Sequence, residues 1–153
     1  MRDPVERLWS QVRMLINSQN RPLISGFLDQ NQAILYALSQ SYMESRSKYE
    51  VTIKNIEDNF DQSDIFYSFY EKIFDPDEYK KLDPFLGFKL IRPNSAEKIF
   101  CFPKNEELNI HTKFSIAIHY NETNSYCLNK FGKRVLQYWK GYELLSQAYK
   151  NRL

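Results

Sequence analysis

The fold class is predicted by residues 113–120, which read Lys-Phe-Ser-Ile-Ala-Ile-His-Tyr. Large apolar side chains occupy every second position, and small or polar ones fill the positions between them (Phe114, Ile116, Ile118 and Tyr120; Ser115, Ala117 and His119). A period of two is typical of a β-strand with one buried face. The small opposite face would let a helix approach closely, so the stretch indicates a strand covered by a helix.

The sequence on both sides of this stretch predicts three further strands, at residues 85–92, 98–102 and 125–129. Polar turn sequences at 93–95 and 121–124 and a longer loop at 103–109 separate the four strands. Because short turns join consecutive antiparallel strands, we expect a four-stranded antiparallel meander over residues 85–129.

Residues 1–83 show the helical period instead. Asp3 and Pro4 are suited to begin a first helix, which should end near Asn17. Its apolar residues recur at helical spacing and predict one buried face (Val5, Leu8, Trp9, Val12 and Ile16). A long second helix is expected from Asp29 to the late fifties, and the weakly apolar residues 39–47 allow a break within it.

Two more helices are expected before the sheet. A third helix should begin at Ser63 and Asp64 and bury the apolar side chains of residues 65–74. A short helix should follow from Asp75-Pro76, and Asp83-Pro84 should end it, because proline removes a backbone donor and clashes with the preceding turn.

A last helix is predicted over residues 130–150, where apolar side chains recur at steps of three and four (Phe131, Val135, Tyr138, Tyr142, Leu145 and Tyr149). Together the elements predict one α+β domain over residues 1–153. It has a helical N-terminal half (1–83), a four-stranded antiparallel meander (85–129) and a C-terminal helix (130–150) packed on the sheet.

The composition excludes several enzyme classes. The chain has 153 residues and 4 glycines, none of which can be placed in a phosphate-binding GxxxxGK[ST] or GxGxxG loop or in a GxSxG nucleophile motif. No stretch reaches the roughly 18 apolar residues of a membrane span, and no signal peptide can be recognised. We therefore expect a cytoplasmic protein with reduced cysteines, no membrane partner and no cofactor.

Charge is segregated along the chain. Residues 55–79 hold eight acids and one lysine, a net charge of −7, whereas residues 128–153 hold six bases and one acid, a net charge of +5. Capping preferences and solvated faces produce such patterns, and the two regions could also face each other within the fold.

The absence of a catalytic motif favours a binding role over an enzyme. Our leading hypothesis is a protein that binds another protein, as an inhibitor, an immunity protein or an adaptor, through an acidic patch that selects a basic partner. The candidate residues are acids at or just before the starts of the third and fourth predicted helices (Asp61, Asp64, Asp75, Asp77 and Glu78).

The alternative hypothesis is a nucleic-acid-binding or nucleic-acid-processing protein. A basic stripe edged by an aromatic side chain could follow a phosphate backbone. On the last helix this stripe would consist of Lys130, Lys133, Arg134, Lys140 and Trp139.

Zinc would accept the chain's cysteines and histidines as ligands (Cys101, His111, His119 and Cys127). The spacing contains no Cys-x-x-Cys or His-x-x-x-His pair, so we predict no metal site and interpret these side chains as buried thiols and incidental histidines.

Overall fold

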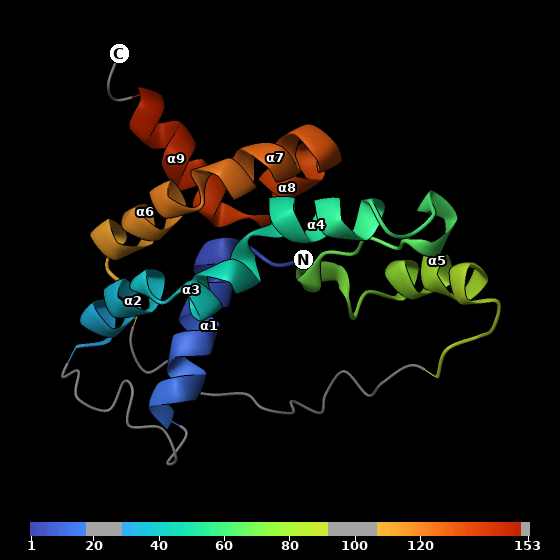
Figure 1. The fold of residues 1–153 in the computed structure, drawn as a ribbon, viewed down its shortest axis with the longest axis horizontal. Helices are drawn as coiled ribbons and strands as arrows, with labels where there is room; N and C mark the ends of the chain where they lie inside the picture. The colour runs from blue at the N-terminus through green and yellow to red at the C-terminus, as the bar shows by residue number, and fades with distance from the viewer. Residues whose placement is uncertain (18–28, 92–106, 151–153) are drawn as a thin grey trace.

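The computed structural model describes residues 1–17, 29–91 and 107–150, and every regular element in these ranges is a helix (Figure 1). The α-helices are α1 (Pro4–Asn17), α2 (Gln30–Ser39), α3 (Ser41–Glu44), α4 (Tyr49–Glu57), α5 (Pro76–Leu86), α6 (Ile110–His119), α7 (Asn121–Phe131), α8 (Lys133–Tyr138) and α9 (Lys140–Lys150). Short 3-10 helices lie at η1 (Ser45–Ser47), η2 (Gln62–Asp64) and η3 (Tyr70–Lys72). The predicted α+β class is therefore wrong.

The predicted meander is replaced by helices wherever the structure describes it. Residues 113–120 lie in α6 with Tyr120 as its C-cap, and residues 125–129 lie in α7. Residues 85 and 86 end α5, residues 87–91 form no strand, and residues 98–102 lie outside the described residues. With no sheet in the described ranges, the last helix packs on other helices instead.

Burial in α6 shows why the period of two misled the prediction. The buried side chains are Thr112, Ile116, Ala117 and Tyr120, which follow helical spacing, while Ile118 is exposed. The Oδ1 atom of Asn109 accepts a hydrogen bond from the Thr112 N–H at 2.7 Å and caps the helix. A cap and a buried alanine thus outweigh the strand preference of the isoleucines.

The prediction for the first helix is confirmed at its start and over most of its buried face. Val5, Leu8, Trp9 and Val12 are buried, as expected. Ile16 is exposed, and the next buried position is Leu15. The helix turns by about 100° per residue, which moves its buried stripe from Ile16 to Leu15 at this end.

Asp3 joins the beginning of the chain to its last helix. Its buried carboxylate accepts one hydrogen bond from the Val5 N–H at 2.9 Å and another from the Gly141 N–H at 2.8 Å. One side chain therefore caps the first turns of both α1 and α9. A Cβ atom at position 141 would lie 2.8 Å from Val5 Cγ2 and 2.9 Å from Asp3 Oδ1, so this close approach requires glycine.

The middle of the chain is more broken than predicted. The expected long helix is interrupted at Gln40, between α2 and α3, and again at Lys48 before α4, within and just after the weakly apolar segment. The expected third helix is wrong, because residues 65–69 form no helix and only the single turn η3 follows. This segment places Phe69 in the core. Its ring centroid lies 5.4 Å from that of Tyr138 and 5.8 Å from that of Phe131.

Helix α5 begins as predicted and ends later. The Asp75 carboxylate accepts a hydrogen bond from the Asp77 N–H at 2.9 Å, and Pro76 occupies the first turn. Pro84 lies inside the helix, so the predicted end at Asp83-Pro84 is wrong. The helix ends at Gly87, whose φ of 74° is in the left-handed region that favours glycine.

The predicted helix over residues 130–150 consists of three pieces. Gly132, with φ of 61°, separates α7 from α8, and Trp139 in an extended conformation separates α8 from α9. Both breaks let Val135 and Trp139 reach the core, where each is buried.

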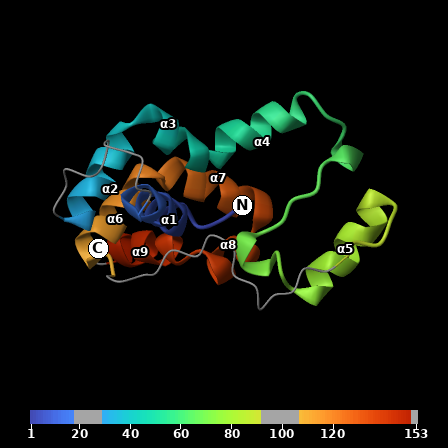
Figure 2. The same ribbon diagram turned by 90° about the horizontal axis from the view of Figure 1, so that it is seen from below.

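Two apolar clusters hold the helices together. The larger one joins α1, α2, α6 and α9, and the smaller one consists of Ile53, Phe69, Cys127, Val135 and Trp139 with partly buried neighbours. Figures 1 and 2 place α5 beyond the end of α4, at the side of the molecule opposite to α2 and α6. We call residues 58–91 the arm.

We predict that Asp3→Ala lowers the free energy of unfolding by about 2–4 kcal/mol, because it leaves two buried N–H groups without their acceptor. Urea unfolding followed by circular dichroism measures the change. The matched control is Asp29→Ala, which removes an exposed cap from α2 alone and should cost about 1 kcal/mol. An Asp3 variant no less stable than the Asp29 variant would contradict the shared cap.

Candidate functional site

The structure separates the five predicted acids into two groups. Asp61 and Asp64 flank and end η2, where both are exposed. Asp75, Asp77 and Glu78 lie at the start of α5 and line a cavity of about 210 Å³. The other lining residues are Lys72, Lys81, Arg134 and Tyr138. The acids of α5 thus face cations, whereas those of η2 face solvent.

Ion pairs occupy this polar cavity. Lys72 Nζ lies 2.6 Å from Asp75 Oδ2, and Lys81 Nζ lies 3.1 Å from Glu78 Oε2. Asp77 is exposed and pairs with Lys80 at 2.8 Å. Each predicted acid of α5 therefore has a cationic partner already, which leaves it less available to a binding partner.

Glu78 connects the arm to α8. Its side chain is only 8% exposed, and its Oε1 accepts from the Ser68 hydroxyl at 3.1 Å and from Arg134 Nη2 at 3.3 Å. Burial acts to raise the pKa of Glu78, but the hydrogen bonds from Lys81 and Ser68 and the charges of Lys81 and Arg134 outweigh it. The pKa of Glu78 therefore lies below its ordinary value, and the carboxylate stays ionised at neutral pH.

The predicted basic stripe is not continuous. Lys130 pairs with Glu57, whose pKa is lowered mainly by the hydrogen bond from this lysine. Arg134 pairs with Glu78, while Lys133 and Lys140 are exposed. Trp139 is completely buried in the smaller core cluster and cannot stack on a base at the surface.

These pairs show that the acidic and basic regions face each other in part, which is one of the arrangements that the charge pattern allowed. Glu57–Lys130 joins α4 to α7, and Glu78–Arg134 joins α5 to α8. Three exposed carboxylates that make no ion pair in the described part of the chain lie close together in the sequence around η2, at Asp58, Asp61 and Asp64. The other exposed acids without such a pair are spread over the chain (Asp29, Glu71, Glu122 and Glu143).

The zinc candidates do not form a site in the described residues. Cys127 is buried in the smaller cluster, and burial raises the pKa of its thiol to about 12. His119 Nε2 lies 2.8 Å from Glu44 Oε1, which also pairs with Lys48. Cys101 lies outside the described ranges, and within them no three ligand side chains come together.

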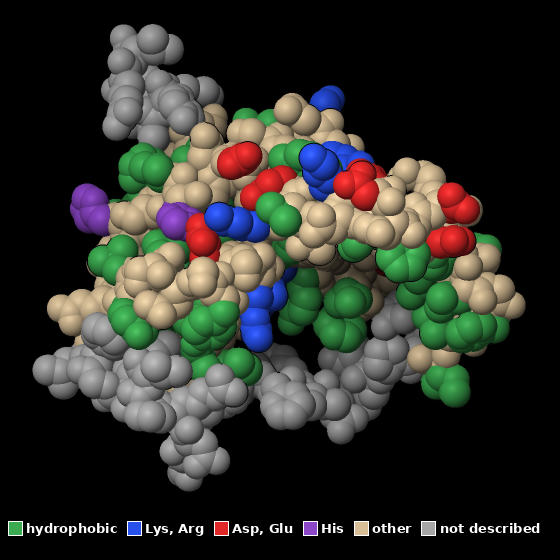
Figure 3. Space-filling model, in the orientation of Figure 1, with side chains coloured by type: hydrophobic (Ala, Val, Ile, Leu, Met, Phe, Trp, Pro, Cys, Tyr) green, Lys and Arg blue, Asp and Glu red, His purple; other side chains and the backbone are tan. Residues whose placement is uncertain are grey.

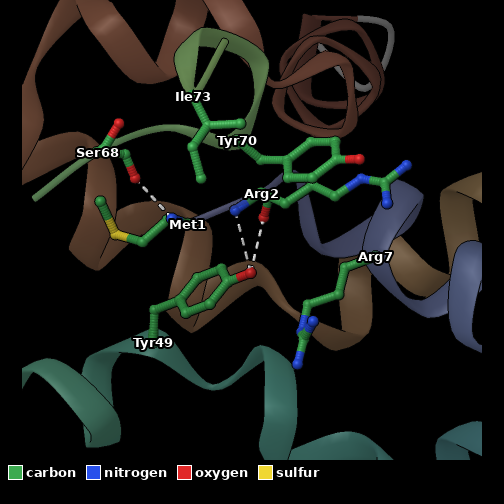
Figure 4. Close-up of a pocket in the computed structure, with 7 residues that line it drawn as sticks. All are labelled: Met1, Arg2, Arg7, Tyr49, Ser68, Tyr70 and Ile73. Atoms are coloured by element: carbon green, nitrogen blue, oxygen red, sulfur yellow. Dashed lines mark hydrogen bonds between the residues drawn. The ribbon is translucent and has the colours of Figure 1, made fainter. Parts of the chain in front are cut away.

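A second cavity contains residues that the sequence did not single out (Figure 4). Its volume is about 360 Å³, and it lies between the start of α1, the start of α4 and the segment around η3. The lining residues are Met1, Arg2, Arg7, Tyr49, Ser68, Tyr70 and Ile73. They come from three distant parts of the sequence, so no local spacing could have indicated them.

Hydrogen bonds fix the walls of this cavity. The Tyr49 hydroxyl donates to the Arg2 carbonyl at 3.0 Å and accepts from the Arg2 N–H at 3.1 Å (Figure 4). The Met1 amine donates to the Ser68 carbonyl at 2.6 Å. The Arg2 guanidinium packs over the Tyr70 ring, 4.6 Å from its centroid. The cavity is therefore held open by contacts between α1, α4 and the arm.

Comparisons with protein-family models, with curated proteins and with solved structures found no match to this chain. Among the described helices, none is long and apolar enough to span a membrane. The function must therefore be inferred from the surfaces and cavities of the structure itself.

We predict a coupling energy of about 1–2 kcal/mol between Glu78 and Arg134 in a double-mutant cycle of Glu78→Gln and Arg134→Gln, because one partner is buried. Urea unfolding of the four proteins gives the value. The exposed Asp77–Lys80 pair is the control and should couple by less than about 0.5 kcal/mol. Equal couplings for the two pairs would show that Glu78 does not hold the arm on α8.

Because the pKa of Glu78 is lowered in the folded state, its contribution to stability is present above the ordinary glutamate pKa and is lost as the pH falls through the folded pKa. We therefore expect wild type and Glu78→Gln to converge in stability at acid pH, as measured by urea unfolding between pH 7 and 3. A stability difference that stays constant over this range would contradict this linkage.

Proposed function

We propose that this chain binds another protein, and that the acidic end of its arm docks on a basic surface of the partner. The observation that carries the proposal is the surroundings of Phe60, whose side chain is 59% exposed. Asp58, Asp61 and Asp64 flank it in the sequence and are exposed as well. Figure 3 shows acidic side chains beyond the end of α4, with hydrophobic side chains beside them over α5.

An exposed aromatic side chain with charged neighbours resembles the composition of a protein interface. Buried aromatic anchors contribute much of the binding energy, and a polar rim surrounds them. Carboxylates that make no ion pair with the described residues keep their charge available, so they would attract a basic partner and speed the encounter. Phe74 and Phe88 of the arm are also more than half exposed, which extends the apolar surface.

The placement of the cations favours this end of the arm over the basic stripe. Lys130 and Arg134 are engaged by Glu57 and Glu78, and Trp139 is in the core. Lys133 and Lys140 are then the exposed remainder of the proposed nucleic-acid surface. Two separate lysines offer a phosphate backbone much less than the contacts on which such binding usually depends.

We predict that Asp61→Lys with Asp64→Lys weakens binding to the partner by about tenfold or more, since the change replaces attraction by repulsion at a basic surface. The partner would be isolated from the native host as a stoichiometric complex, and its affinity measured at two salt concentrations. Binding to wild type should weaken at high salt, because salt screens exposed charges. Phe60→Ala should weaken binding at both salt concentrations.

The control carries the same change of charge on another face, with Glu122→Lys on α7 and Glu143→Lys on α9. It should bind like wild type. The proposal fails if the Asp61/Asp64 variant keeps its partner. It also fails if the captured partner is a nucleic acid and the double variant Lys133→Glu/Lys140→Glu no longer binds it.

A further inference from the structure

The cavity of Figure 4 carries an inference that is independent of the proposed partner surface. Its volume of about 360 Å³ is within the range of pockets that hold small organic ligands. The figure shows Arg2 and Tyr70 on one side, with Tyr49 and Arg7 on the other. The cavity thus brings two guanidinium groups and two phenol rings around one space.

The lining of the cavity is positively charged, because it includes Arg2 and Arg7 and its lining residues include no Asp or Glu. The Nε atom of Arg7 donates to the Arg46 carbonyl at 2.8 Å, and the guanidinium makes no ion pair with a carboxylate of the described residues. Arg2 has one such partner, Glu6, at 3.8 Å, which is too long for a hydrogen bond. Glu71 also acts on the Met1 amine and on Tyr49 through its charge. Among the described residues, no carboxylate pairs with the terminal nitrogens of Arg7, so these nitrogens can bind an anion.

The side of the cavity formed by the arm is apolar and incompletely covered. Tyr70 is 48% exposed and Ile73 is 45% exposed, although both line the cavity. Two hydrogen bonds to Arg2 hold the Tyr49 hydroxyl against the start of the chain. A planar ring placed here would cover apolar surface and could stack on a tyrosine.

Guanidinium groups recognise phosphate and carboxylate through paired, charge-assisted hydrogen bonds. We propose that this cavity binds a small organic anion that carries a planar ring, with its acidic group on Arg7 and its ring against Tyr70 and Ile73. The ligand would contact α1, α4 and the arm at once, so its binding would hold these three segments together.

The simplest probe that carries both parts is phenyl phosphate, with phenol and inorganic phosphate as its separate parts. We expect phenyl phosphate to bind with a Kd of about 1 mM or lower. Phenol and inorganic phosphate should each bind with a Kd at least about tenfold higher. Titrations followed by protein NMR would measure the affinities and show which residues respond. Benzoate, which has the same ring and a carboxylate, would show whether phosphate is required.

Two variants divide the site. Arg7→Gln should weaken phenyl phosphate by about tenfold, whereas Arg46→Gln removes a charge outside the cavity and should change the affinity less than about twofold. Tyr70→Ala changes an exposed ring, so the fold should persist. It should weaken phenyl phosphate and leave inorganic phosphate unchanged.

The inference is overturned if no probe with a ring and an acidic group gives saturable shifts at the lining residues up to about 10 mM, which is beyond the affinity expected of a built site. It is also overturned if Arg7→Gln and Arg46→Gln weaken binding equally, because binding would then follow the general charge of the surface.

Discussion

The fold depends on the carboxylate of Asp3, which is buried, makes no ion pair with a described residue and holds the first turns of two helices. Burial raises the pKa of this group, and the N–H bonds from Gly141 and Val5 counteract the rise. With the folded pKa above the ordinary value, the native state binds more protons than the unfolded chain, so this group makes the fold less stable as the pH rises through the folded pKa. The two caps offset that cost by satisfying two buried donors.

The position of the arm follows from a second set of contacts. Phe69 enters the smaller cluster from an extended segment, and the neighbouring Ser68 holds Met1 through its carbonyl and Glu78 through its hydroxyl. Ser68 lines the larger cavity, and its hydroxyl donates to Glu78, which lines the polar cavity, so this one residue connects the two. Beyond it the arm has few buried side chains, which leaves Phe60 and the acids around η2 at the surface.

The sequence predicts features that depend on local chemistry. The start of α1 at Asp3-Pro4, the start of α5 at Asp75-Pro76 and the break after α2 all follow from capping residues and weak apolar segments. The strand over residues 113–120 was wrong because large apolar residues at every second position resemble a strand, and only the burial of Thr112 and Ala117 shows the helical period. Local patterns carry no information about which face a distant helix will cover.

The candidate sites show the same limit. The charge segregation was visible in the sequence, but which charges neutralise each other depends on the packing of α5 on α8 and of α4 on α7. Trp139 is the clearest example of this limit. Its position beside lysines in the sequence suggested a surface residue, but the break between α8 and α9 directs its side chain into the core. The cavity with Arg7 and Tyr70 joins segments too far apart for any motif.

The hydrogen bond between Asp3 and Gly141 also has a consequence for the order of folding. It closes a loop of 138 residues, and the entropy of closing a loop must be lost before the contact can form. Most contacts of a helical protein are local and form quickly, but this one is not. During synthesis, Asp3 can accept its hydrogen bond from the nearby Val5 N–H early. Its hydrogen bond from Gly141 must wait until α9 has left the ribosome.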